Sequence, residues 1–322
     1  MKLARRTLLL GLAGPAVAAP ALVHAEGWPS RSLRLVVSFA PGASADFFAR
    51  ALAPRLEARF GQPVVVENRP GAGGNIGVDV VAKAAPDGHV LGIAAAGALS
   101  VNPVLQPTMP YDVQRDLAPV GLALDIPFAL VAGANIPGDL RAVIAAAKAQ
   151  PERFAMAHGG NGTGMHLAAA LLLQMAGLQM PMAPFRGSAP AATAVLAGDT
   201  ALGVVDIPAC LALVQAGQLR ALGVTSAARV AALPDVPTVA EAALLGYESV
   251  GWFGLIAPAG TPAAVVQRLS AALRDELPPL TQRLLAVGAV PHWMAPDAFA
   301  GFIRAESTKY AAVIRAADIR VE

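Results

Sequence analysis

Cysteine is almost absent from this sequence of 322 residues, because Cys210 is the single one. A lone cysteine excludes an intramolecular disulfide framework and any zinc or iron–sulfur site built from several cysteines. The five histidines do not follow the spacing of HExxH or of another common metal-binding motif. We therefore predict a protein that carries no metal and no other cofactor.

Charged residues are also scarce, at 14% of the chain. Three of the 24 basic residues lie within the first 25 positions, which leaves 21 basic against 22 acidic residues from Glu26 onward. That part has no basic run of the kind that neutralises phosphates, so nucleic acid is not an expected partner. With 55% hydrophobic residues, the composition favours a folded protein over a disordered one.

Residues 1–25 have the pattern of an export signal. A basic start precedes a short apolar segment, and Val23 and Ala25 suit the −3 and −1 positions of a cleavage site. The apolar segment is shorter than the roughly 20 residues that a membrane-spanning helix needs. Its arginine pair fits a twin-arginine signal, and the general secretory route stays open as well. We expect cleavage before Glu26 and a periplasmic protein.

Beyond the signal, apolar segments of strand length alternate with helical patterns. Leu33 to Phe39 is rich in β-branched residues and stops at Pro-Gly, which is typical of a buried strand and a turn. Residues 44–60 repeat apolar side chains at helical spacing, with Ser44 as the expected N-cap and Pro54 as an expected kink or early stop. The alternation continues along the chain and predicts an α/β protein with mainly parallel sheets between helices.

Two junctions between a strand and a helix carry loops rich in small residues, at 40–46 and 158–166. Ligands of parallel sheets bind outside the carboxyl ends of the strands. The N-terminus of a helix adds unpaired N–H donors and a partial positive charge. Neither loop contains Lys or Arg. Two such junctions that face each other would clamp a carboxylate through backbone N–H groups and helix dipoles.

Two other patterns point to different functions. The glycine-rich run 71–77 misses the GxGxxG spacing of dinucleotide-binding proteins, because its sixth position is Ile76. The segment around Ser44 resembles the GxSxG turn of serine hydrolases without its last glycine. Ser44, His166 and Asp206 would need the geometry of a catalytic triad, which the sequence does not define. An exported hydrolase with Ser44 as its nucleophile is therefore kept as the alternative.

Three further polar side chains have two interpretations each. Asp46 and Asp206 follow strands, where they would receive an ammonium group or a bound water, or would serve as a helix cap and a turn former. Arg186 lies in a glycine-containing loop, where it would draw in anions or would remain a solvated surface residue.

The order of many short motifs resembles a known family, the periplasmic solute-binding component of tripartite tricarboxylate transporters, also called Bug-type receptors. These motifs span nearly the whole chain after the signal. They are Phe39-Ala40-Pro41-Gly42, Gly61 to Gly77 (GQPVVVENRPGAGGNIG), Ala85-Pro86-Asp87-Gly88, Asn102-Pro103, Tyr111-Asp112, Gly160-Asn161-Gly162-Thr163, His166-Leu167-Ala168, Gly187 to Ala191 (GSAPA), Leu222 to Ser226 (LGVTS), Leu233 to Glu241 (LPDVPTVAE) and Ala257 to Pro262 (APAGTP).

The resemblance implies a two-lobed periplasmic-binding-protein fold, similar to type II, with two chain crossings and the ligand cleft between the lobes. It also implies a receptor, not an enzyme, that binds a small carboxylate and delivers it to membrane transporter subunits. We expect a monomer with one lobe at 28–126 plus 250–322 and the other at 127–249. A receptor that informs a membrane sensor is the variant of this role that the sequence leaves open.

Together the loops and the resemblance place the ligand contacts in both lobes. The predicted residues are Phe39, Ala43, Ser44, Ala45, Asp46, Thr163, Gly164, Met165, His166 and Asp206. In the family the first loop usually reads Pro-Gly-Gly-x-x-Asp, and here Ala43 replaces a glycine. Relatives often have a serine after Gly-Asn-Gly-Thr, where this chain has Gly164-Met165. A methionine at the mouth of the cleft makes it more apolar and weakens the inference to citrate itself.

Overall fold

The computed structural model describes residues 27–316. The predicted export signal, its cleavage site and the last six residues lie outside the described residues. Ten strands form the framework: β1 (Leu33–Val37), β2 (Val64–Asn68), β3 (Val90–Ala95), β4 (Leu117–Gly133), β5 (Met156–His158), β6 (Met182–Pro184), β7 (Leu202–Asp206), β8 (Leu219–Val224), β9 (Val250–Pro258) and β10 (Val290–Met294).

Helices connect most of these strands. They are α1 (Ser44–Phe60), α2 (Asn75–Ala82), α3 (Asn102–Leu105), α4 (Val113–Asp116), α5 (Leu140–Ala149), α6 (Gly164–Ala176), α7 (Ser188–Ala197), α8 (Ile207–Gln215), α9 (Val239–Ala242), α10 (Ala263–Glu276), α11 (Thr281–Leu285) and α12 (Pro296–Ala316). Among the described residues, no helix combines the length and the apolar character that crossing a bilayer requires.

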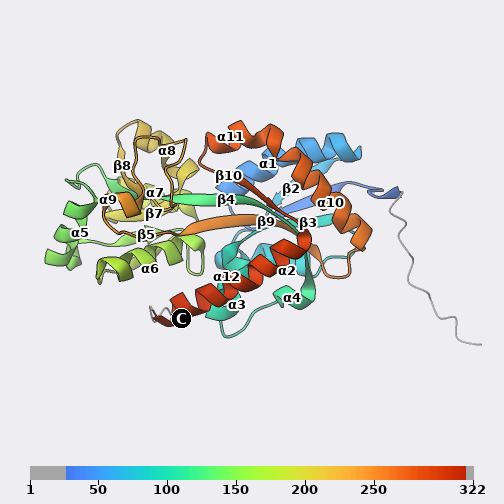
Figure 1. Cartoon of the computed structure of the whole chain (residues 1–322), viewed down its shortest axis with the longest axis horizontal. Coiled ribbons are helices and arrows are strands. Elements are labelled where there is room, and N and C mark those ends of the chain that lie inside the picture. Colours follow the sequence, from blue (N-terminus) through green and yellow to red (C-terminus); the bar gives the residue numbers. More distant parts are fainter. Residues whose placement is uncertain (1–26, 317–322) are drawn as a thin grey trace, which may run out of the picture.

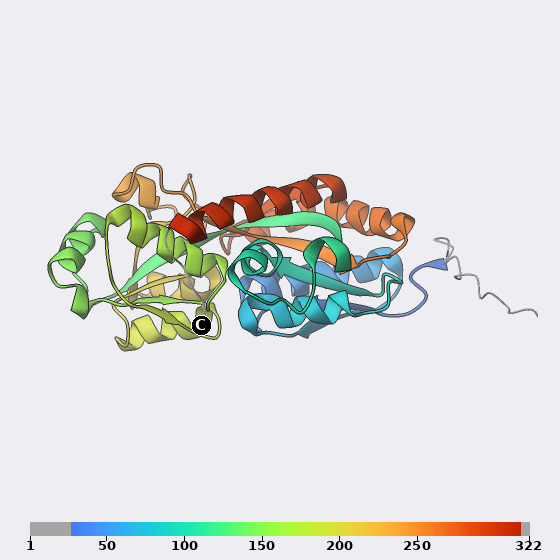
Figure 2. The same cartoon turned by 90° about the horizontal axis from the view of Figure 1, so that it is seen from below.

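The strands form two lobes that share β4 (Figure 1). In one lobe the order is β2-β1-β3-β9-β4, with β10 also on β4. In the other lobe β7, β5 and β6 follow the far half of β4, and β8 pairs with its other edge. β4 pairs with β9 over Leu117–Pro127 and with β7 over Phe128–Ala132, so one strand runs through both lobes. Figure 2 shows the two lobes side by side.

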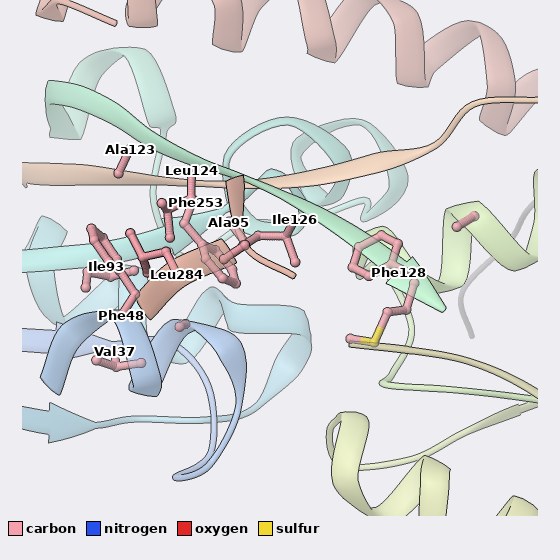
Figure 3. Packing of buried hydrophobic residues seen from close by; sticks show 14 of the residues in the cluster. Val37, Phe48, Ile93, Ala95, Ala123, Leu124, Ile126, Phe128, Phe253 and Leu284 are labelled. Carbon is pink, nitrogen blue, oxygen red and sulfur yellow. The ribbon is translucent and has the colours of Figure 1, made fainter. Parts of the chain in front are cut away.

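Apolar packing follows the helical and strand periodicities. Phe48, Leu52 and Leu56 are fully buried on the inner face of α1. From there the core continues along β3 and β4 to the crossing between the lobes, where Ile126 and Phe128 are also buried (Figure 3). The strand that joins the lobes is therefore part of the hydrophobic core, which fixes the positions of the residues at the crossing.

The fold class is confirmed, although several details differ from the predictions. The pairs β1–β2, β1–β3, β5–β6 and β5–β7 are parallel, whereas β4, β8, β9 and β10 pair in antiparallel fashion. The sheets are therefore mixed and not mainly parallel. The antiparallel pairs involve strands that join a sheet after the chain has left that sheet and returned to it.

The predicted N-cap of α1 was wrong, and the early stop expected at Pro54 is absent. Ala43, not Ser44, is the N-cap, and it supplies no side-chain hydrogen bond. Pro54 does not shorten the helix, which continues to Phe60. Pro54 is exposed, so water can satisfy the carbonyl that its missing N–H leaves free. Burial of the opposite face of α1 then holds the helix together.

Candidate functional site

Loops from both lobes meet at a small cavity where the chain crosses between them. Phe39 follows β1 in the first lobe, Thr163 and Gly164 begin α6 in the second, and Asp206 ends β7. The full lining is Phe39, Ala95, Ala96, Ile126, Phe128, Thr163, Gly164, Met165, Asp206, Gly251, Trp252 and Phe253. The cavity volume is about 30 Å³, which is room for about two or three water molecules. A carboxylate with a longer body must therefore extend beyond it or part the lobes.

The walls of the cavity are largely apolar and include four aromatic side chains. The rings of Phe39 and Phe253 have their centroids 5.9 Å apart. The ring of Phe128 lies against two glycines, since an added Cβ would come within 2.6 Å of it at Gly251 and within 3.0 Å at Gly164. The start of α6 thus packs directly on the two crossing strands. A side chain at Gly251 would therefore displace the Phe128 ring.

A wide groove adjoins the cavity and shares Phe39 and Thr163 with it. Its volume is about 950 Å³, and residues 70–74 of the first lobe and 184–187 of the second line it. Arg186 is the basic side chain among the described lining residues, and it is exposed. The groove is large enough to admit a small organic acid to the cavity.

The carboxylate of Asp46 is used within its own loop. It accepts hydrogen bonds from the Gly42 N–H at 3.0 Å, from Arg50 Nε at 3.0 Å and from Asn68 Nδ2 at 2.9 Å. Burial opposes ionisation, but these bonds outweigh it and hold the pKa of Asp46 below its ordinary value. Asp46 does not line the cavity. The structure thus favours a loop-holding role for Asp46 over contact with an ammonium group or a bound water.

Asp206 is the acidic side chain in the lining of the cavity, and it is buried. Burial raises the pKa of its carboxyl group, and the Ser44 hydroxyl and N–H lower it again in part. Among the described residues, the Ser44 hydroxyl oxygen nevertheless has no partner that satisfies both the distance and the angle of a hydrogen bond. The backbone N–H of Asp206 donates to Ser188 Oγ at 2.5 Å. Asp206 of the second lobe therefore lies beside the N-terminus of α1 in the first.

Thr163 caps α6 and shapes the second loop. Its Oγ1 accepts a hydrogen bond from the His166 N–H at 3.3 Å and donates one to the Gly160 carbonyl at 2.7 Å. Met165 is 5% exposed, and its sulfur lies 3.5 Å from Ser188 Oγ. The loop is thus held by its own contacts, and the N–H groups of Gly164 and Met165 at the start of α6 are left for a ligand.

His166 points into the second lobe, away from the cavity lining. Its Nδ1 accepts a hydrogen bond from the Gly162 N–H at 3.2 Å, and its ring stacks on His158 with centroids 4.6 Å apart. Burial lowers the pKa of His166 to about 4 and that of His158 to about 3, so both rings are neutral at pH 7. His166 thus has its partners within its own lobe and does not activate Ser44, as a hydrolase would require.

Of the ten predicted contacts, five line the cavity: Phe39, Thr163, Gly164, Met165 and Asp206. Ser44 adjoins Asp206 without lining it, and Ala43, Ala45, Asp46 and His166 lie outside the lining. Ala45 is fully buried in the core, so only its backbone could serve a ligand.

The cavity lining also includes residues that no local pattern in the sequence indicated, namely Ala95, Ala96, Ile126, Phe128 and Gly251. Trp252 and Phe253, which also line the cavity, carried the one available signal, a pair of large aromatics directly after a glycine. Within residues 27–316 no group of three or more His, Cys, Asp or Glu side chains could hold a metal ion.

Comparison with known proteins identifies relatives over nearly the whole chain. A family model described as "Tripartite tricarboxylate transporter family receptor" matches residues 48–319. Protein BugT of Bordetella pertussis (strain Tohama I) is 37% identical over 321 residues, which cover 98% of each chain.

Two solved structures have the same architecture. Rpa4515 of R. palustris with adipate is 33% identical and superimposes with a TM-score of 0.86, covering 91% of this chain and 99% of that one. The periplasmic binding protein BugD is 31% identical with a TM-score of 0.85, covering 92% of this chain and all of that one.

Proposed function

Because this chain belongs to the tripartite tricarboxylate transporter receptor family, we propose that it binds a small carboxylate in the periplasm and delivers it to a tripartite-type membrane transporter. The family and its structural neighbours are solute-binding receptors and not enzymes. The observation that carries the proposal is the N-terminus of α6 in the lining of the cavity between the lobes, with the N-terminus of α1 beside Asp206 of that lining. Helix N-termini favour anions.

The ligand of a relative supports a carboxylate, and the cavity lining indicates how its charge would be held. Adipate, a dicarboxylate, is present with the relative Rpa4515. The described cavity lining contains no basic side chain, so backbone N–H groups near Ser44 and Gly164 would hold the charge. A hydrogen bond to a charged group contributes about 1.5–3 kcal/mol, so several suffice for micromolar binding. Asp206 would repel any ionised carboxylate close to it, so one acid group would lie on the α6 side of the cavity and a second one in the outer groove.

Closure of the two lobes would complete the site. We place the crossings at Ile126–Phe128 and at Val250, with the lobes at 28–126 plus 250–322 and at 127–249. A ligand that touches both lobes stabilises the closed arrangement by its greater affinity for it.

The proposed function is tested by identifying a bound acid and measuring closure. Native mass spectrometry of protein purified from the periplasm without refolding is expected to show a bound small acid. Adding that acid should raise the melting temperature and reduce the radius of gyration in small-angle X-ray scattering. If adipate, malate, citrate and an aromatic acid all leave the melting temperature unchanged, the carboxylate assignment is wrong. An unchanged radius with saturating ligand would show a rigid cleft.

Arg186 is expected to steer the ligand and not to bind it. Its side chain is exposed on the rim of the groove, where it would raise the rate of association through long-range attraction. We expect Arg186→Ala to slow association two- to threefold at low salt, to leave dissociation unchanged, and to have no effect at high salt. Stopped-flow fluorescence measures both rates. Arg186→Lys serves as the control that keeps the charge, and a hundredfold faster dissociation of Arg186→Ala would reveal a direct salt bridge instead.

A further inference from the structure

The lobes also meet along a seam of backbone, formed by Gly73, Gly97 and Asn102 in the first lobe and Asn161 and Gly162 in the second. A Cβ on Gly73 would lie 2.9 Å from the Asn161 carbonyl oxygen, and a Cβ on Gly97 would lie 2.7 Å from that of Gly162. Distances this short leave no room for a side chain. The two backbones therefore touch directly, and any parting of the lobes must separate them.

Asn102 is the side chain at this seam, and it is fully buried. Its Nδ2 donates a hydrogen bond of 2.8 Å to Asn75 Oδ1 within the first lobe. Its Oδ1 is buried and has no hydrogen-bond partner among the described residues. A Cβ on Gly162 would lie only 1.9 Å from that oxygen, so Oδ1 rests against the backbone of the second lobe.

A buried acceptor without a partner raises the free energy of the arrangement that buries it. When the lobes part, Gly162 moves away from Asn102 and water can reach Oδ1. The unpaired oxygen therefore penalises the closed arrangement and leaves the open arrangement unaffected. We propose that Asn102 is a positioning residue that sets the affinity of this receptor, by opposing closure until a ligand compensates for it. This inference rests on the closure included in the proposed function.

The test replaces the carboxamide with an apolar side chain of similar shape. In Asn102→Leu the unpaired oxygen is gone, while Asn75 Oδ1 keeps its hydrogen bond from the Tyr111 hydroxyl at 3.1 Å. We expect the ratio of closed to open molecules without ligand to rise about tenfold, in line with the loss of one unsatisfied acceptor. The affinity for added adipate should rise as well, through slower dissociation.

Asn102→Asp is expected to act in the opposite direction. It places a charge against Gly162 in the closed arrangement, where burial of an unpaired charge is costlier still. The closed fraction and the affinity should both fall. Tyr111→Phe is the matched control, because it removes a hydroxyl from the same network at a point outside the seam, and it should leave the closed fraction unchanged.

The lobe distance is measured by single-molecule fluorescence transfer between dyes on Val65→Cys in β2 and Leu196→Cys in α7. Both positions are exposed, and the native Cys210 is fully buried, so labelling stays on the two new thiols. Without ligand, a higher closed fraction in Asn102→Leu together with a lower closed fraction in Asn102→Asp supports the inference. Any other combination of the two closed fractions overturns it. Because this readout needs no ligand, it stands even if adipate and other carboxylates fail to bind.

Discussion

The buried histidine pair is expected to remove about 4 kcal/mol from the free energy of unfolding when the pH falls from 7 to 5. Both rings are neutral in the folded protein, since burial lowers the pKa of His158 to about 3 and that of His166 to about 4. In the unfolded chain each has a pKa of about 6.5. The unfolded state therefore binds more protons below pH 6.5, and each histidine contributes about 2 kcal/mol of destabilisation at pH 5.

This pH window separates the histidines from the other titrating groups. Carboxyl groups with a lowered pKa, such as Asp46 and Asp116, cause a loss of stability only as the pH falls below their ordinary value near 4. Asp125 and Asp206 have raised pKa values because of burial, so they favour the folded state as the pH falls. The loss that begins just below pH 6.5 therefore belongs to the stacked pair.

Urea denaturation at pH 7 and pH 5 measures this effect. In the wild type, Nδ1 of His158 accepts a hydrogen bond from the Gly160 N–H, and Nδ1 of His166 accepts one from the Gly162 N–H. The variants His158→Asn and His166→Asn keep an acceptor, the amide oxygen, near the position of that nitrogen. Each variant is expected to be less stable at pH 7 but to lose about 2 kcal/mol less than the wild type on going to pH 5. Equal pH dependence in the wild type and in both variants would show that the rings are not neutral in the fold.

Gly164→Pro is expected to weaken carboxylate binding by tenfold to a hundredfold. Gly164 is the first residue of α6, where the N–H has no partner within the helix. Proline removes that N–H, and a bond to a charged group contributes about 1.5–3 kcal/mol. The fold should tolerate this change, because proline is favoured at the first helical position. The preceding Thr163 already has the extended φ of −84° and ψ of 162° that proline requires.

Gly164→Ala is the control that separates the N–H from the added bulk. Both variants place a Cβ about 3.0 Å from the Phe128 ring, but only alanine keeps the N–H. Isothermal titration calorimetry with the acid found in the purified protein compares the two. If alanine weakens binding as much as proline does, crowding at Phe128 explains the loss and the backbone-clamp mechanism is wrong.

The elements that the sequence predicted well are those whose pattern is local. α1 has the predicted bounds, β1 ends at Val37 and not at the predicted Phe39, and the loop before α6 is where its small residues indicated. β4 is different, because only its end, residues 128–132, has the pattern of a strand. Pro119, Gly121 and Pro127 interrupt the rest. The partner β9 is more than a hundred residues away, and register shifts near Pro119 absorb the irregularity. No local signal encodes such pairing.

The residues of the candidate site also divide into those with a local sequence signal and those that come together only in the folded chain. Thr163 and Gly164 were found because a loop before a helix is readable from composition. Ile126, Phe128 and Gly251 were missed, because they become neighbours only when two distant strands cross. Asp46 was assigned to the ligand because its position after a strand was readable, whereas its bonds to Arg50 and Asn68 depend on how α1 and β2 pack.

The sharing of strands between lobes also determines the order in which the chain can fold. β3 needs β9 as its neighbour, and β9 begins at Val250, after the whole second lobe. Before the last quarter of the chain is available, one edge of β3 has unpaired N–H and C=O groups, and such edges recruit other strands. The second lobe, by contrast, is nearly complete once β8 ends at Val224. A chain that emerges from the ribosome or crosses a membrane N-terminus first therefore starts its first lobe early and can finish it only at the end.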